Sequence, residues 1–211
     1  MRPVYFCLIP YFEYYDGTEA PDVPECTNFL PVDIPGENNA ECYELLFGAL
    51  SAKKELPRTL AGTAAENDGI IKDDGVIEDA TVVFCAKADS GALVTVGWYA
   101  HANVTLTPEY LPMTDEDGRE ILHPFFFCTH RQNAVLLPPD ERFRPEWQIP
   151  RNKSHAKGKF GFSADPFWLC DEPTPAAVTW TTAFLEQVAA YTENGDNLLD
   201  DTPDGEEEPA T

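Results

Sequence analysis

Basic residues are scarce in this 211-residue chain, which has 14 Lys and Arg against 37 Asp and Glu. The net charge of −23 excludes a general nucleic-acid coat or a membrane-surface protein, because both need a basic surface. Long apolar runs are missing too, since none approaches the roughly 20 residues of a bilayer-spanning helix. Residues 1–10 lack the small-residue cleavage site of a signal peptide. The sequence therefore predicts a cytoplasmic protein without a membrane segment.

Motifs of catalytic and cofactor sites are also absent. The chain has neither G-x-x-x-x-G-K-[ST] nor G-x-G-x-x-G, the loops that hold phosphates and dinucleotides. Its six cysteines form no C-x-x-C pair and its four histidines have no metal-ligand spacing. We therefore expect no metal, no cofactor and six reduced, structural cysteines. The segment around Ser163 lacks the second glycine of a nucleophile elbow. A non-catalytic protein is favoured, and an enzyme of unrecognised class is the alternative.

Short apolar runs of strand type dominate the rest of the chain. Residues 81–88 and 92–100 are joined by Asp89-Ser90-Gly91, a turn typical of a hairpin. Further strands are expected in residues 4–12, 104–107, 121–129 and 134–137. Residues 42–50 fit a strand or a helix, and residues 51–79 read as a long loop. This pattern predicts a mainly β (α+β) domain with a curled or barrel-like sheet.

One C-terminal helix is expected to pack on this sheet. Thr174 is a good N-cap, Pro175 fits the first helical position, and Gly195 is a natural stop. An apolar stripe follows at helical spacing: Trp180, Phe184, Val188 and Tyr191. We predict one domain over residues 1–195 and an acidic, disordered tail over residues 196–211.

A cationic segment interrupts the acidic chain. Seven of the 14 basic residues lie between Arg131 and Lys159, against three acidic ones, and none follows Lys159. Aromatic residues lie within or just after this segment, and rings beside cationic groups are typical of a surface that stacks bases and holds phosphates. The alternatives are a solvated loop neutralised by acidic neighbours and rings that belong to the core.

Several blocks resemble an uncharacterised bacterial domain family. They are N-F-L-P-V at 28–32, V-G-W-Y at 96–99 with N-V-T at 103–105, I-P-R at 149–151, K-G-K-F-G-F at 157–162 with Trp168, and the helical block 183–199. The resemblance implies a PUA-like reader of modified nucleobases in a restriction or defence context, with a nuclease or other effector protein as partner. The chain departs from the family where Ala100-His101-Ala102 is inserted and the family's lysine is missing.

The leading hypothesis is a module that reads nucleic acid through residues 131–159. Its candidate binding residues are Trp98, Asn103, Arg131, Arg144, Arg151, Lys157, Lys159 and Trp168. Arg151, Lys157 and Lys159 would hold phosphates; Trp98 or Trp168 would stack on an extruded base, and Asn103 would read the base edge.

An acidic protein-interaction protein, or a nucleic-acid mimic, is the second hypothesis, and halophilic adaptation is a third explanation of the charge. The first two hypotheses predict different structures. Basic residues and Trp98 around one pocket would favour the reader. Basic residues used in internal pairs, beneath an acidic surface, would favour the interaction protein.

Overall fold

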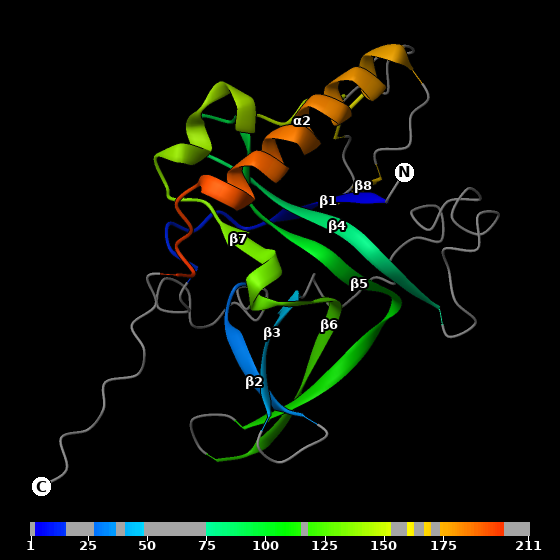
Figure 1. Cartoon of the computed structure of the whole chain (residues 1–211), viewed down its shortest axis with the longest axis vertical. Helices are drawn as coiled ribbons and strands as arrows, with labels where there is room; N and C mark the ends of the chain where they lie inside the picture. The colour runs from blue at the N-terminus through cyan, green and yellow to red at the C-terminus, as the bar shows by residue number, and fades with distance from the viewer. Residues whose placement is uncertain are drawn as a thin grey trace, which may run out of the picture.

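A single open β-sheet with one long helix across it forms the fold (Figure 1). The computed structural model describes residues 3–15, 28–36, 41–48, 75–114, 118–152, 160–162, 167–169 and 174–200. The strands are β1 Val4–Ile9, β2 Pro31–Pro35, β3 Cys42–Gly48, β4 Val76–Lys87, β5 Leu93–Thr114, β6 Glu120–His130, β7 Ala134–Leu136 and β8 Phe167–Leu169. The helix α2 is Pro175–Asn194, and short 3-10 helices span Arg131–Asn133, Glu141–Phe143 and Pro145–Trp147. The mainly β prediction is confirmed.

The sheet order is β2-β3-β6-β5-β4-β1-β8, with β7 paired to β5 off this path. Only β1 and β4 pair in parallel; the other described pairs are antiparallel. Among the described strands, the end strands β2 and β8 do not pair with each other, so of the curled or barrel-like sheet that the sequence predicts, the barrel-like alternative does not form. Alternating apolar residues predict a strand, but they do not say whether the first and last strands meet.

The β4–β5 hairpin forms at the predicted turn. Ala88 N donates to Ala92 O at 3.0 Å and Gly91 N donates to Ala88 O at 2.8 Å. Gly91 has a φ of 83°, which glycine adopts without steric cost. The strand β4 starts at Val76, so the long loop predicted through residue 79 is wrong at its end.

Ala100-His101-Ala102 forms a bulge in β5. Tyr99 pairs with Val82 and Ala102 with Ala80, so β5 carries one extra residue between these pairs. His101 has a φ of 51°, and its Nδ1 lies 2.7 Å from Asp79 Oδ1. The extra residue is therefore accommodated within the sheet by this bulge.

The helix α2 has the predicted bounds. Thr174 Oγ1 accepts a hydrogen bond from Ala177 N at 3.2 Å, as expected of an N-cap. Phe184 and Val188 of the predicted stripe are buried, while Trp180 and Tyr191 lie half-buried beside them. Among the described helices, none is long and apolar enough to cross a membrane.

Two apolar clusters occupy the opposite faces of the sheet. One includes Phe6, Trp98 and Trp147 together with Phe184 of α2, and the other gathers around Phe84. Adjacent residues of one strand point to opposite faces, and β1, β4, β5 and β7 each supply both clusters. The helix therefore covers one face, and both faces of the central strands are buried.

The segment after α2 is docked on the domain. Leu199 is 5% exposed, and Leu198 N donates to Leu136 O at 3.0 Å. The prediction that the folded domain ends at residue 195 is therefore wrong, because residues 196–200 pack on the domain. Leu198 and Leu199 interrupt the acidic run, and their side chains lie against the core. Residues 201–211, the rest of the predicted tail, lie outside the described residues.

The described cysteines are free thiols. Cys7 and Cys85 are fully buried, and burial raises their pKa well above the usual value. Burial also raises the pKa of Cys128 to about 11. Cys42 is exposed, so its thiol is not part of the core, and Cys26 and Cys170 lie outside the described residues.

Candidate functional site

Trp98 is not a surface ring. It is 0% exposed, its ring stacks on Trp147 at 5.4 Å between centroids, and its Nε1 donates to Thr192 Oγ1 at 3.1 Å. A base could reach it only if α2 left the sheet. The prediction that Trp98 offers an exposed stacking platform is therefore wrong, because strand alternation does not show which face a distant helix will cover.

Trp168 is buried in the same cluster. It is 7% exposed and stacks on Phe6 at 4.8 Å, with the half-buried Trp180 and Phe160 beside it. The ring contributes to the core between β1, β8 and α2. An exposed stacking role for Trp168 is wrong for the same reason as for Trp98.

Asn103 is exposed on β5, opposite Cys128 of β6. The two tryptophans that were to stack on a base are sealed in the core, so the structure does not bring Asn103 and an accessible tryptophan ring together. Arg151 is also exposed and makes an isolated bridge with Phe162. Lys157 and Lys159 lie outside the described residues.

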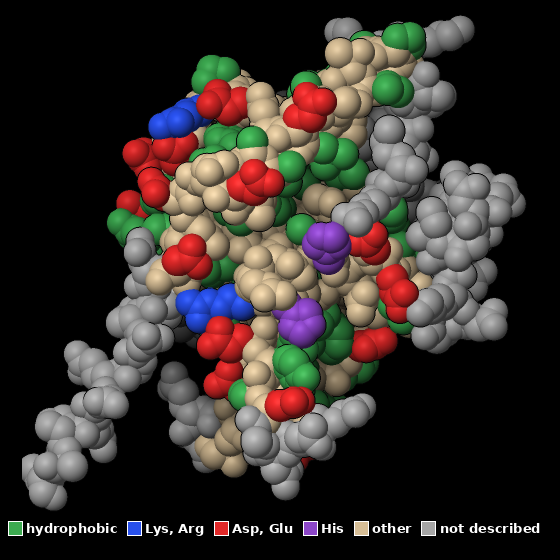
Figure 2. All heavy atoms as spheres, in the orientation of Figure 1, with side chains coloured by type: hydrophobic (Ala, Val, Ile, Leu, Met, Phe, Trp, Pro, Cys, Tyr) green, Lys and Arg blue, Asp and Glu red, His purple; other side chains and the backbone are tan. Residues whose placement is uncertain are grey.

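The other arginines of the cationic segment are engaged within the fold. Arg131 Nη1 donates to Glu44 Oε2 at 2.9 Å, and its Nη2 donates to the carbonyl of Leu199. Arg144 pairs with Glu141. On the face shown in Figure 2, the blue basic side chains lie directly beside red acidic ones. Arg131 and Arg144 are thus neutralised locally, at separate positions of the fold.

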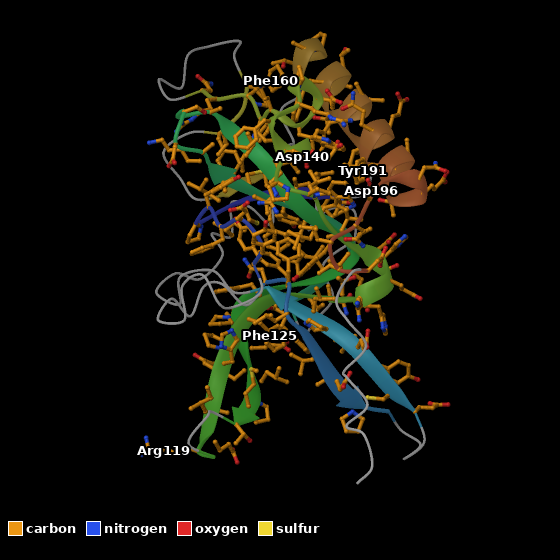
Figure 3. The ribbon with its side chains drawn as sticks, turned by 90° about the vertical axis from the view of Figure 1, so that its left-hand side faces the viewer. Arg119, Phe125, Asp140, Phe160, Tyr191 and Asp196 are labelled. Atoms are coloured by element: carbon orange, nitrogen blue, oxygen red, sulfur yellow. The ribbon has the colours of Figure 1, made fainter. Side chains whose placement is uncertain are left out.

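A cavity of about 520 Å³ lies where α2 ends against the two 3-10 helices of residues 141–147. We call it the helix-end pocket. Its lining includes three carboxylates, one guanidinium and two aromatic rings: Glu141, Glu146, Asp196, Arg144, Trp147 and Tyr191. In Figure 3, Tyr191 and Asp196 lie at the end of α2, with Asp140 near them. Carboxylates thus outnumber basic groups around this pocket.

The electrostatics of the helix-end pocket favour a cation. The last turn of α2 contains no basic residue, so the negative end of the helix dipole is not offset by a basic side chain in that turn. The pKa of Tyr191 is raised to about 12, first by burial and then by Glu141 and Asp196, against an opposing effect of Arg144. Burial is thus the main cause of the raised pKa, and the nearby carboxylates add to it.

The aromatic wall of the pocket is held in place. The Tyr191 ring meets Trp147 edge-on at 5.4 Å and Trp98 at 5.8 Å. Its hydroxyl donates to Asp196 O at 2.9 Å. Gly195 is required here, because a Cβ at that position would overlap the Tyr191 ring. The helix end, the ring and the turn after it therefore form one rigid wall.

Glu141 has an unused acceptor. Its Oε1 pairs with Arg144, whereas its Oε2 is buried and has no hydrogen-bond partner in the part of the chain that the structure describes. A buried carboxylate oxygen without a donor is unfavourable. This side chain is 13% exposed, and that of Arg144 is 56% exposed. The carboxylate is thus fixed in the wall while its cation extends into solvent.

A smaller cavity of about 310 Å³ lies on the other side of Tyr191 and Gly195, and is lined by Arg131, Glu44 and Asp200 among others. Among the described residues, no group of His, Cys, Asp and Glu has the arrangement that a metal ion needs.

Sequence reasoning missed Glu141, Asp196 and the exposed side of Tyr191. The available signal was a helix followed by Asp196, with no basic residue in its last turn, where lysine or arginine is favourable.

Comparisons with protein-family models, with curated proteins and with solved structures find no match for this chain.

Proposed function

We propose that this chain is a non-catalytic binding module whose partner is a protein with a basic segment. The observation that carries the proposal is the helix-end pocket, where three carboxylates and the end of α2 face an open cavity. Such a site attracts cationic groups and repels phosphates. The net charge of −23 adds long-range attraction for a basic partner, which accelerates encounter more than it strengthens the complex.

The contacts of the described arginines also support a basic partner over a nucleic acid. Arg131 and Arg144 pair with carboxylates, and Arg142 is fully buried, so these three present little free positive charge to a nucleic acid. Internal pairing of the basic residues is one of the two features expected of an acidic interaction protein, the other being a continuous acidic surface.

Reading of nucleic acid is the competing function, and it stays a prediction. Arg151 is exposed and would be its remaining described phosphate contact. The family resemblance, the PUA-like and defence assignments, an effector partner and the cytoplasmic location also stay predictions, because no comparison finds a match.

Fluorescence anisotropy with the full chain tests the proposal. The probes are a labelled arginine-rich peptide, the same peptide with glutamine at each arginine, and labelled single-stranded and duplex oligonucleotides. At about 0.15 M salt, where long-range attraction is screened, we expect saturable binding of the arginine peptide alone. Binding of an oligonucleotide without binding of the peptide would overturn the proposal in favour of the nucleic-acid reader.

A further inference from the structure

We propose that the helix-end pocket receives an arginine side chain of the partner, which displaces Arg144 from Glu141. The inference rests on the proposed function and specifies its contact. Arg144 then acts as a resident counter-ion that occupies the site in the free protein.

The geometry of Glu141 calls for a second donor. Arg144 Nη2 donates to Oε1 alone, and Oε2 is buried without a partner among the described residues. A guanidinium is a planar fork whose two N–H groups match the two oxygens of a carboxylate. Because Oε2 is buried in the free protein, a partner guanidinium can reach both oxygens only as Arg144 leaves, and the proposed displacement provides that opening.

The position of the Arg144 side chain allows it to leave Glu141. This side chain is 56% exposed whereas that of Glu141 is 13% exposed, so Arg144 is the member of the pair that solvent and a partner can reach. Its backbone is fixed separately, since Arg144 N donates to Glu141 O at 3.0 Å and Trp147 N donates to Arg144 O at 3.1 Å. The side chain can therefore swing away while the two 3-10 helices keep the pocket wall in place.

The rest of the pocket favours arginine over lysine. The half-buried ring of Tyr191 lines the cavity and is held by its hydrogen bond to Asp196 O. Guanidinium groups stack on such rings and shed water more readily than ammonium groups. Glu146 and Asp196 keep the surrounding potential negative. The pocket thus combines a carboxylate that can pair with the N–H groups of a guanidinium and an aromatic ring on which the planar face of that guanidinium can stack.

Small probes test the ligand class directly. Nα-acetylarginine amide, Nα-acetyllysine amide and Nα-acetylcitrulline amide are titrated into the full chain, and the backbone amide signals of Asn194 and Gly195 are followed by NMR. We expect shifts with the arginine probe, weaker binding of the lysine probe and none of citrulline, which has the same shape without the charge. Equal shifts with arginine and citrulline would overturn the inference.

Three charge variants test the displacement with the arginine-rich peptide. Arg144→Gln removes the competitor and should tighten peptide binding several-fold, whereas Glu141→Gln should weaken it by about tenfold. Glu186→Gln is the matched control, because Glu186 is exposed on α2 outside the pocket lining. A phosphate-binding role for Arg144 predicts the opposite sign, namely that Arg144→Gln weakens binding of an oligonucleotide.

The outcomes separate the two proposals. If the wild-type chain binds the peptide and Arg144→Gln leaves the affinity unchanged, the pocket assignment fails and the proposed function stands. If the wild-type chain binds no basic peptide, the proposed function fails and the assignment fails with it. The Arg144→Gln variant keeps the test valid even where Glu141→Gln does not fold, because Arg144 is exposed and its backbone bonds do not use the side chain.

Discussion

Arg142 shows how one residue can be misread from composition. The sequence places it in the cationic segment, but its side chain is 0% exposed. It donates to the carbonyls of Leu137, Phe12 and Glu13, each at 2.8 Å, and its guanidinium lies 5.5 Å from the centre of the Tyr15 ring. Arginine suits this position because its donors form a rigid fork. Arg142 therefore ties the segment after β1 to the segment after β7.

Replacement of this arginine should be costly. Arg142→Met keeps much of the volume but leaves the three carbonyls without this donor, and we expect the free energy of unfolding to fall by about 3–5 kcal/mol. Urea denaturation at constant m-value measures the change. Arg151→Met is the control, since Arg151 is exposed and its replacement should cost less than about 1 kcal/mol. Similar losses in both variants would contradict the structural role of Arg142.

Tyr191 should give the fold an alkaline pH dependence. Its pKa is about 12 in the folded chain, against an ordinary value of 10.0. The folded state holds this proton more tightly, so the resulting stabilisation is present below pH 10 and is lost as pH rises through about 12.

Tyr191→Phe isolates this contribution. At neutral pH the variant should lose about 0.5 kcal/mol with the hydrogen bond to Asp196 O. Between pH 10 and 12 the wild type should lose more stability than the variant, so the difference between them should shrink or reverse. Urea midpoints across this range measure it. A constant difference would show that the phenol does not titrate as described.

At the scale of elements, the segment after α2 completes β7. This strand pairs with β5 along one edge. Along its other edge, the side chain of Asn197 makes hydrogen bonds to the backbone of β7, as a neighbouring strand would. Asn197 Oδ1 accepts from Leu136 N at 2.9 Å, and its Nδ2 donates to Ala134 O at 3.1 Å. An amide side chain carries the same donor and acceptor as the backbone, which is why it can satisfy a strand edge.

Two truncations locate the end of the folded domain. A chain that ends after Asp200 should melt within about 1 °C of the full chain. A chain that ends after Gly195 loses the burial of Leu199 and the bonds of Asn197, and its free energy of unfolding should fall by about 3–5 kcal/mol. Thermal and urea denaturation measure both. Equal stability of the two truncated chains would show that residues 196–200 do not contribute.

At the scale of the whole molecule, charge should oppose folding. With a net charge of −23, the compact state brings like charges together. Salt screens this repulsion, so the urea midpoint should rise between about 0.02 M and 0.5 M NaCl. A midpoint that falls with salt would mean that surface pairs such as Arg131–Glu44 outweigh the general repulsion.

Local patterns in the sequence determined much of the fold. Thr174, Pro175 and Gly195 mark the ends of α2, and Asp89-Ser90-Gly91 marks the β4–β5 hairpin, because caps and tight turns depend on neighbouring residues. The parallel pairing of β1 with β4 and the open sheet edge were not predictable in this way. They depend on strands far apart in the sequence, whose partners no local pattern specifies.

The candidate site belongs to the tertiary structure for the same reason. The sequence located the arginines but not their partners: Glu44 lies 87 residues before Arg131, and Phe12 lies 130 before Arg142. Whether a charge is free or paired, and whether Trp98 is open or covered, depends on which distant element packs against it. The sequence by itself determined the strands, the helix and the excess of negative charge. Only the packing of α2 against residues 141–147 brought three of the carboxylates together around one cavity.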